Sequence, residues 1–507
     1  MHIVVVGAGL GGLTLSHALA KRGHTVDLVD KQPAVKSQLG AAIGLTGGLA
    51  VMRSLGLARE IDPYLTPMRS FKGSSLVGGG GAAEPEGKLT TSFGEAMIPE
   101  KAQFELPPIL LDRRSSESRN YLRNYEMFHD EGGGAAASDS QRRRTVHGIS
   151  RTALSDDESG PSSEAFMAMI TREHLHALLH RTLPLNVSLW LNCNVVHVET
   201  ISDGGTSASV TLSDGTRLTG DLVVGADGIH SIVRRTVASD DADGRTLTTS
   251  QRRYTGISGV YGLVVKHTFE LMMKCSLKKD EKAEALLESL PVGGLHEFEG
   301  KGAIATVFNL KRHYMFVFFE AREDPPTSDE NWTNPAVQEE ISSKIKAQGM
   351  PSLFEHLLRA APDGGRVVHL GLYESEPMRT SWSRGRAVLL GDSAHATTPF
   401  LGQGANQAML DAWSLAFHLP PANASDYICA DDDDLHHHIQ KALHRYETAR
   451  STHATNIKSV SRMFGHIRLG ITSWDRCVRR CFMQTLLTCG RGCLFRQMLK
   501  WASQLNV

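Results

Sequence analysis

The first 30 residues constrain the fold of this chain more than any other stretch. Residues 2–6 form an apolar run typical of a buried strand, a glycine-rich turn begins at Gly7, and residues 13–21 have the pattern of a helix. Residues 23–30 form a second predicted strand that ends in a carboxylate. A strand, a glycine turn, a helix and a strand with an acidic end are the parts of a dinucleotide-binding βαβ unit. The sequence therefore predicts a Rossmann-type α/β domain at the start of the chain.

Each glycine of this GxGxxG turn has a separate predicted role. Gly7 allows the tight turn, Gly9 lets the backbone approach a pyrophosphate, and Gly12 lets the helix and strand pack closely. The helix N-terminus attracts the charged pyrophosphate, and the carboxylate at the end of the second strand suits the ribose hydroxyls. The predicted contacts of this unit are Gly7, Ala8, Gly9, Gly11, Gly12, Asp30 and Lys31.

A second motif lies at residues 388–411, where a short apolar strand precedes a carboxylate, a proline-bounded loop and a glycine-rich helix start. The carboxylate of Asp392 suits a polyol, and a planar ring can lie against the loop near Pro399. The N–H groups after Gly402 and the helix dipole favour an electron-rich group beyond the helix end. Reduced flavin has all three features. The predicted flavin contacts are Gly391, Asp392, Pro399, Gly402, Gly404, Ala405 and Asn406.

A third motif lies at residues 221–234, where a strand runs into Asp227 and Gly228 before a helix. With the three motifs in this order, the chain resembles the class A flavoprotein monooxygenases, the group similar to p-hydroxybenzoate hydroxylase. The resemblance covers most of residues 1–93 and 166–460. It implies that the GxGxxG turn holds the ADP half of FAD and that Gly391 and Asp392 hold the ribityl chain. It also implies that Asp227 and Gly228 lie near the pyrophosphate and take part in NAD(P)H use.

The resemblance adds two residues to the cofactor site. Arg172 begins an Arg-x-x-Leu-x-x-x-Leu helix start, and it would reach the ribityl or phosphate oxygens of FAD. Val195 would lie along the adenine through its backbone. No catalytic base is chosen. His395 invites that role because histidine as a residue type titrates near neutral pH, but the family tolerates a histidine here without it.

The predicted fold class is α/β, with a Rossmann-type FAD-binding domain, an inserted β-sheet substrate domain and a C-terminal helical tail. A chain of 507 residues exceeds one ordinary core, so at least two domains are expected. The resemblance makes the FAD domain discontinuous and places the substrate between its flavin and the second sheet. The predicted segments are 1–94, 166–250 and 380–460 for the FAD domain, 251–379 for the substrate domain, 461–507 for the tail, and a mostly disordered insert at 95–165.

The activity that the resemblance implies is that of an FAD-dependent monooxygenase with NAD(P)H as co-substrate. Such an enzyme uses O2 to hydroxylate or epoxidise a small aromatic, heterocyclic or isoprenoid molecule through a flavin C4a-hydroperoxide. Two alternatives stay open: a flavin-dependent reductase of isoprenoid double bonds, and a non-catalytic FAD-binding redox partner. A flavin halogenase is disfavoured because the signature Trp-x-Trp-x-Ile-Pro is absent.

One departure from the family pattern bears on the substrate. Members related to urate, salicylate and carotenoid oxygenases often have Trp-Arg at the positions that Val260 and Tyr261 occupy here. The arginine often helps at the active site, so its absence disfavours those substrates. Tyr261 is the one candidate substrate contact, and a packed strand tyrosine is the alternative.

Composition limits the partners and the location. The formal net charge is −1, which gives no reason to expect nucleic acid. Seven cysteines in a chain of this length favour a reducing compartment, and no apolar run reaches the length of a membrane span, so we expect a cytoplasmic protein. The basic, amphipathic tail is expected to pack on the FAD domain; peripheral contact with an anionic membrane is the alternative.

Two clusters of histidines or cysteines, residue types that can bind metals, are expected not to form metal sites. The three histidines at 436–438 are expected in a polar loop between helices, because no matched ligand pair accompanies them. Cys477, Cys481, Cys489 and Cys493 have helical spacing within each pair and are expected to be buried helical cysteines.

Overall fold

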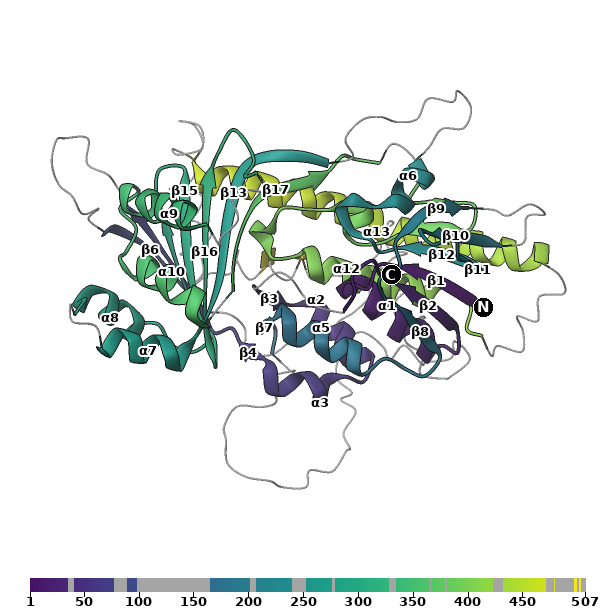
Figure 1. Cartoon of the computed structure of the whole chain (residues 1–507), viewed down its shortest axis with the longest axis horizontal. Coiled ribbons are helices and arrows are strands. Elements are labelled where there is room, and N and C mark those ends of the chain that lie inside the picture. Colours follow the sequence, from purple (N-terminus) through teal and green to yellow (C-terminus); the bar gives the residue numbers. More distant parts are fainter. Residues whose placement is uncertain are drawn as a thin grey trace, which may run out of the picture.

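The computed structural model describes residues 1–34, 41–76, 89–97, 165–200, 207–238, 252–275, 279–327, 334–364, 366–378, 381–422, 432–470, 478, 497–498 and 501–502. Figure 1 shows two large sheets side by side, each covered by helices. Most of the insert predicted to be disordered lies outside these residues, and so does most of the predicted tail, including its four cysteines.

The first large sheet has six strands in the order β18-β19-β12-β1-β2-β8. Strand β1 pairs in parallel with β2 and β12, and β12 pairs in parallel with β19. The central strand is fully buried at Ile3, Val4 and Val5, because helices cover both faces of such a sheet. The bounds are β1 His2–Val6, β2 Thr25–Val29, β8 Val187–Trp190, β12 Leu222–Gly225, β18 Ser383–Arg384 and β19 Ala387–Leu389.

Two helices of this domain, α1 (Leu10–Lys21) and α12 (Gly404–His418), pack against each other, and α13 (Asp432–Leu469) packs along α12. The indole N–H of Trp413 on α12 donates to Ser54 Oγ at 2.7 Å, which fixes α2 to the same layer. The other helices here are α2 Gly47–Ser54, α3 Ala58–Ile61, α5 Arg172–Arg181, α6 Ile232–Ala238 and α11 Asp392–His395, with 3-10 turns η1 Asp62–Tyr64, η3 Gly228–His230 and η4 Pro399–Leu401.

Two three-stranded sheets complete this domain. The first has the order β11-β10-β9 and the second β3-β7-β4. Strand β7 leads directly into α5, whose N-terminus is capped by the Thr171 side chain. The bounds are β3 Ala42–Leu45, β4 Thr66–Pro67, β7 Ala168–Thr171, β9 Val195–Glu199, β10 Ala208–Leu212 and β11 Arg217–Gly220.

The second large sheet has seven strands in the order β17-β13-β16-β15-β14-β5-β6. Alternate residues of its long strand β13 serve two cores: Val260 packs under the helices, and Tyr261 faces the first domain. The strands are β5 Ser70–Leu76, β6 Leu89–Met97, β13 Arg252–Val265, β14 Gly294–Glu299, β15 Ala303–Asn309, β16 His313–Ala321 and β17 Arg366–Ser375, and the helices are α7 Lys266–Cys275, α8 Glu281–Glu288, α9 Pro335–Ala347 and α10 Leu353–Gly364.

The structure differs from the sequence prediction in the bounds of the segments and in the position of the three histidines. Strands β5 and β6 belong to the second sheet, since β5 pairs in parallel with β14, so this part of segment 1–94 lies with the substrate domain and β6 continues past residue 95. The histidines at 436–438 lie within α13, not in a loop, and α13 crosses the predicted boundary at residue 460.

The described residues near the C-terminus contact the first domain. The carbonyl of Ala502 accepts a hydrogen bond from Gln407 of α12 at 2.9 Å, and the ring of Trp501 lies 5.5 Å from that of His453. These contacts agree with a tail that packs on the FAD domain; membrane contact by other parts of the tail stays a prediction. None of the helices in the described part of the chain is long and apolar enough to cross a bilayer.

The glycine turn generates a stability prediction. A Cβ at Gly12 would lie 1.9 Å from the carbonyl oxygen of Gly7, which itself has φ +105°. We expect Gly12→Ala to lower the free energy of unfolding by about 3 kcal/mol, because the α1 backbone must move away from β1. Urea denaturation of the FAD-free protein measures the effect, and an unchanged midpoint would contradict this close contact.

Candidate active site between the two sheets

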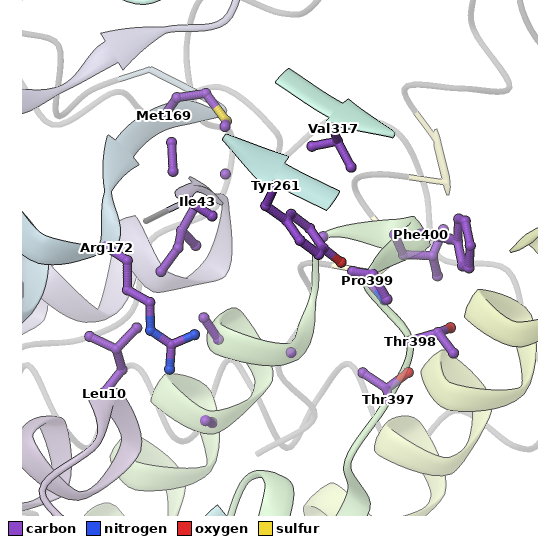
Figure 2. Close-up of a pocket in the computed structure, with 18 of the residues that line it drawn as sticks. Leu10, Ile43, Met169, Arg172, Tyr261, Val317, Thr397, Thr398, Pro399 and Phe400 are labelled. Atoms are coloured by element: carbon purple, nitrogen blue, oxygen red, sulfur yellow. The ribbon is translucent and has the colours of Figure 1, made fainter. Parts of the chain in front are cut away.

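A cavity of about 460 Å³ lies between the two domains and is lined by both. Figure 2 shows Arg172 reaching in from one side and Tyr261 from the second sheet. Eleven of the predicted site residues line this cavity, although they come from distant parts of the chain: Gly9, Gly11, Arg172, Gly228, Tyr261, Gly391, Asp392, Pro399, Gly402, Gly404 and Ala405.

Two helix N-termini meet this cavity. Helix α1 begins after Gly9 and α12 begins after Gln403, and neither start has a side-chain cap. The first N–H groups of a helix lack partners within it and carry partial positive charge. Because the first residues of both helices line the cavity, anionic or electron-rich groups are favoured there.

Three glycines of the cavity lining leave space beside the backbone. A Cβ built at Gly9, Gly228 or Gly402 would meet no described protein atom within 4 Å, although each residue lines the cavity. The space that these glycines leave is therefore not filled by protein packing, and it is available to a ligand that approaches the backbone closely.

Asp30 lies beside the glycine turn, as the βαβ pattern predicts. Its Oδ2 accepts a hydrogen bond from the Ala8 amide and its Oδ1 one from the Gln32 amide, both at 2.7 Å. Asp30 does not line the cavity, and neither do Lys31, which is exposed, and Val195, which is buried at the start of β9. Their contact with a cofactor stays a prediction.

Two predicted contact residues use their side chains to hold the protein itself. Asn406 Oδ1 accepts from the amides of Thr46 and Gly48, both at 2.9 Å, and its Nδ2 donates to two carbonyls. Asp227 Oδ2 accepts from the Ile232 amide at 2.7 Å, and burial raises the pKa of this carboxyl. Neither side chain lines the cavity, so both position loops around it.

Arg172 and Asp392 bring opposite charges into the cavity. The exposed surface of Asp392 faces the cavity, yet surrounding protein desolvates the carboxyl and raises its pKa, against the opposing charges of His395 and Arg172. Burial lowers the pKa of Arg172, which Asp392 counteracts, but a guanidinium stays charged in proteins. The pair offers donors for phosphate or hydroxyl oxygens and an acceptor for hydroxyl groups.

A buried carboxylate beneath Gly391 was not found from the sequence. Asp411 of α12 accepts from the Gly391 amide at 2.9 Å, from His395 Nε2 at 2.6 Å and from Arg450 Nε at 2.7 Å. Electrostatic interactions and hydrogen bonds with His395 and Arg450 hold the pKa of the Asp411 carboxyl well below its usual range despite burial. His395 thus supports the turn at Gly391 through its contact with Asp411.

A second support, which the sequence did not reveal, joins the segment after Asp227 and Gly228 to the segment after Gly391 and Asp392. Arg234 of α6 donates through Nη1 to the carbonyls of Ser393 and Ala394, at 3.0 and 2.7 Å. Ser393 Oγ in turn donates to the Gly225 carbonyl at 2.6 Å. No spacing rule connects these positions, which lie about 160 residues apart, so only the folded chain brings them together.

The second sheet gives the cavity an apolar wall. The Tyr261 ring packs edge-on against Phe319 at 5.6 Å, and its hydroxyl makes no hydrogen bond to any described residue. Figure 2 shows that hydroxyl directed toward Pro399. Burial raises the pKa of Tyr261, so it is a neutral donor at physiological pH. The other apolar residues of the cavity lining, which come from both domains, are Phe71, Leu295, Phe308, Val317, Phe400, Phe464 and the methionines 68, 167, 169, 315 and 498.

Comparison with known proteins agrees with this geometry. Two models of an FAD binding domain match the chain, one over residues 2–250 and the other over residues 195–422. The FAD-dependent monooxygenase paxM of Penicillium paxilli is 24% identical over 438 residues, which are 82% of this chain and 68% of that protein. The 3-amino-4-hydroxybenzoate 2-monooxygenase PtnB3 of Streptomyces platensis is 30% identical over 298 residues, 59% of this chain and 63% of that protein.

By its two FAD binding domain matches and its relatives, the chain is an FAD-dependent monooxygenase. Solved structures share the fold of this monooxygenase. Klebsiella pneumoniae HpxO, complexed with FAD and uric acid, has a TM-score of 0.62 at 19% identity and covers 96% of this chain and 92% of that one. The 2,6-dihydroxypyridine-3-hydroxylase of Arthrobacter nicotinovorans has a TM-score of 0.60 at 16% identity, with 93% of each chain covered. The FAD binding domain matches and the monooxygenase relatives therefore confirm the expected cofactor FAD, and the roles of single residues stay predictions.

The glycine lining generates a prediction for cofactor binding in this monooxygenase. Gly9 has φ −71°, which alanine adopts without strain, and a Cβ there would meet only the space left for a ligand. We expect Gly9→Ala to weaken FAD binding by about tenfold or more, since the new methyl group overlaps the bound cofactor. Isothermal titration of FAD-free protein with FAD measures this affinity.

The control is the folding stability of the same variant. We expect the FAD-free Gly9→Ala protein to unfold at the wild-type urea concentration, in contrast to Gly12→Ala. Wild-type FAD affinity in Gly9→Ala would show that the cofactor does not approach this turn.

Proposed function

We propose that this monooxygenase takes electrons from NAD(P)H and inserts one atom of O2 into a small, mainly apolar molecule bound between the two sheets. One observation carries the proposal: a single cavity has two uncapped helix N-termini on one side and an apolar sheet face on the other. The first side suits FAD, and the second suits an aromatic, heterocyclic or isoprenoid substrate.

The residues of the first domain would bind and orient FAD. We assign Gly9 and Gly11 with the start of α1 to the pyrophosphate, and Arg172 and Asp392 to the ribityl and phosphate oxygens. The start of α12 at Gly404 would stabilise negative charge on the flavin pyrimidine edge. Bound FAD supplies the redox and oxygen chemistry of the reaction, and the protein supplies position and electrostatics.

The residues of the second sheet would hold the substrate and exclude water. Phe308, Val317 and Phe319 present only carbon atoms to the cavity. A dry site protects reactive groups from hydrolysis and strengthens the electrostatic interactions within it. The hydroxyl of Tyr261 would donate a hydrogen bond to the substrate. The two alternatives, an isoprenoid reductase and a redox partner without activity, share the FAD site but not the use of oxygen.

We expect NAD(P)H oxidation and oxygen uptake to rise together when the FAD-loaded protein meets a suitable substrate. The experiment screens neutral phenolic, N-heterocyclic and isoprenoid compounds with NADH and with NADPH, and records absorbance and dissolved oxygen in parallel. Substrate-stimulated NAD(P)H oxidation without oxygen uptake would favour the reductase. No stimulation of either signal by any class of compound would favour the redox partner.

We further expect Tyr261→Phe to raise KM for that substrate by about two- to tenfold, the usual effect of losing one neutral hydrogen bond. FAD content should be unchanged, because the ring still packs on Phe319. The matched control is Tyr314→Phe, which removes a hydroxyl that bonds Glu270 at 2.9 Å outside the cavity lining. Equal KM values for wild type and Tyr261→Phe would remove Tyr261 from the substrate site.

A further inference from the structure

The apolar wall of the cavity contains one buried polar cluster, which we name the Glu297 cluster: Glu297 on β14, Thr306 on β15 and Arg468 in the last turn of α13. All three residues line the cavity. Glu297 is 1% exposed and Arg468 8%. Every other side chain named on this wall is carbon or thioether except the Tyr261 hydroxyl, so the cluster is its main polar feature.

The contacts within the cluster are well defined. Glu297 Oε1 accepts from Arg468 Nε at 3.1 Å, and Oε2 accepts from Thr306 Oγ1 at 3.2 Å and forms an ion pair with Arg468 Nη2. Glu297 and Thr306 are direct cross-strand partners, which holds the carboxylate in place. The carboxylate and guanidinium therefore cancel each other's charge within the wall.

Stability alone gives a weak reason for such a pair. A buried ion pair loses the hydration of both charges, and apolar residues of similar size often stabilise a protein as well or better. The neighbours here are apolar, so a Leu or Met pair would continue the wall. Because the cluster lies in the lining of the proposed substrate cavity, its position favours a role in substrate recognition.

The remaining hydrogen-bonding capacity favours a donor on the ligand. A carboxylate has about four lone-pair sites. Oε2 has two partners, Thr306 and Arg468, whereas Oε1 has one among the described residues. A ligand hydroxyl or N–H group can use the open site on Oε1. The Glu297 carboxylate would repel an anionic ligand, because the Arg468 charge already pairs with that carboxylate.

We propose that the Glu297 cluster determines substrate specificity by binding a neutral hydroxyl or N–H group of an otherwise apolar substrate and by rejecting carboxylates. This inference rests on the proposed function, because it takes the cavity as the substrate site. It narrows the substrate class from any aromatic, heterocyclic or isoprenoid molecule to a neutral one with a hydrogen-bond donor on the part that faces this wall.

The test compares three matched probes on the FAD-loaded protein: 2-naphthol, 2-naphthoate and 2-methylnaphthalene. Equilibrium dialysis gives the Kd of each probe and requires no turnover. Wild type should bind 2-naphthol more tightly than both other probes. Glu297→Gln keeps the side-chain shape but removes the negative charge and the carboxylate acceptor, so the preference for naphthol over naphthoate should fall by about tenfold or more, the effect of one charge-assisted hydrogen bond.

Glu374→Gln is the matched control. Glu374 is also buried and also pairs with an α13 arginine, Arg462, at 3.0 Å, but it does not line the cavity. This variant should keep the wild-type ratio of the two Kd values. If Glu297 has a merely structural role, Glu297→Gln should behave like Glu374→Gln: each variant loses stability, and neither changes the ratio of the two Kd values.

Two results would overturn the proposal. The first is a wild-type protein that binds 2-naphthoate as tightly as 2-naphthol, or that binds no naphthol. This measurement needs only the wild-type protein, so it tests the proposal even if Glu297→Gln fails to fold. The second is a folded Glu297→Gln protein with an unchanged ratio. Failure of the monooxygenase reaction itself is seen separately, as missing oxygen uptake with normal probe binding.

Discussion

The close contact between α1 and α12 determines where the rest of the site lies. A Cβ at Gly11 would come within 2.8 Å of Leu390 and 3.3 Å of Ala408, and one at Gly391 would come within 2.8 Å of Ala408. Because only small residues meet here, two helix N-termini and the turn after β19 reach the same cavity. Larger residues would separate the helices, and the positive ends of their dipoles would no longer act on one ligand.

Charges below this contact keep the turn in place. Asp411 ties the Gly391 amide to His395 and Arg450, and Arg234 ties the neighbouring carbonyls to α6. Asp411 and Arg450 are fully buried and Arg234 is 4% exposed, so both supports depend on geometry that a flexible loop would not keep. The cofactor side of the cavity is thus preorganised, while the substrate side depends on packing between sheet and helix.

Much of the first-domain lining of the cavity could be predicted from the sequence because its signals are local. GxGxxG, Gly391-Asp392 and Arg172 each stand in a short motif, and the residues of those motifs that line the cavity include Gly9, Asp392 and Arg172. The sequence did not predict the Asp411 network or the Glu297 cluster, because their members meet only through contacts between residues 9 to 171 positions apart. Strands β5 and β6 were misplaced for the same reason, since their partner β14 is distant in sequence.

The five methionines of the substrate wall also bear on how long such an enzyme survives. A thioether is readily converted to a sulfoxide, which is polar and changes the shape of the side chain. In the proposed reaction oxygen is activated in the cavity that Met68, Met167, Met169, Met315 and Met498 line, so any oxidant that escapes the substrate would meet these side chains. Tight coupling of electron consumption to product formation would therefore save the electron donor and also protect the enzyme from oxidation. The number of turnovers before inactivation would then report how well a substrate fits the cavity.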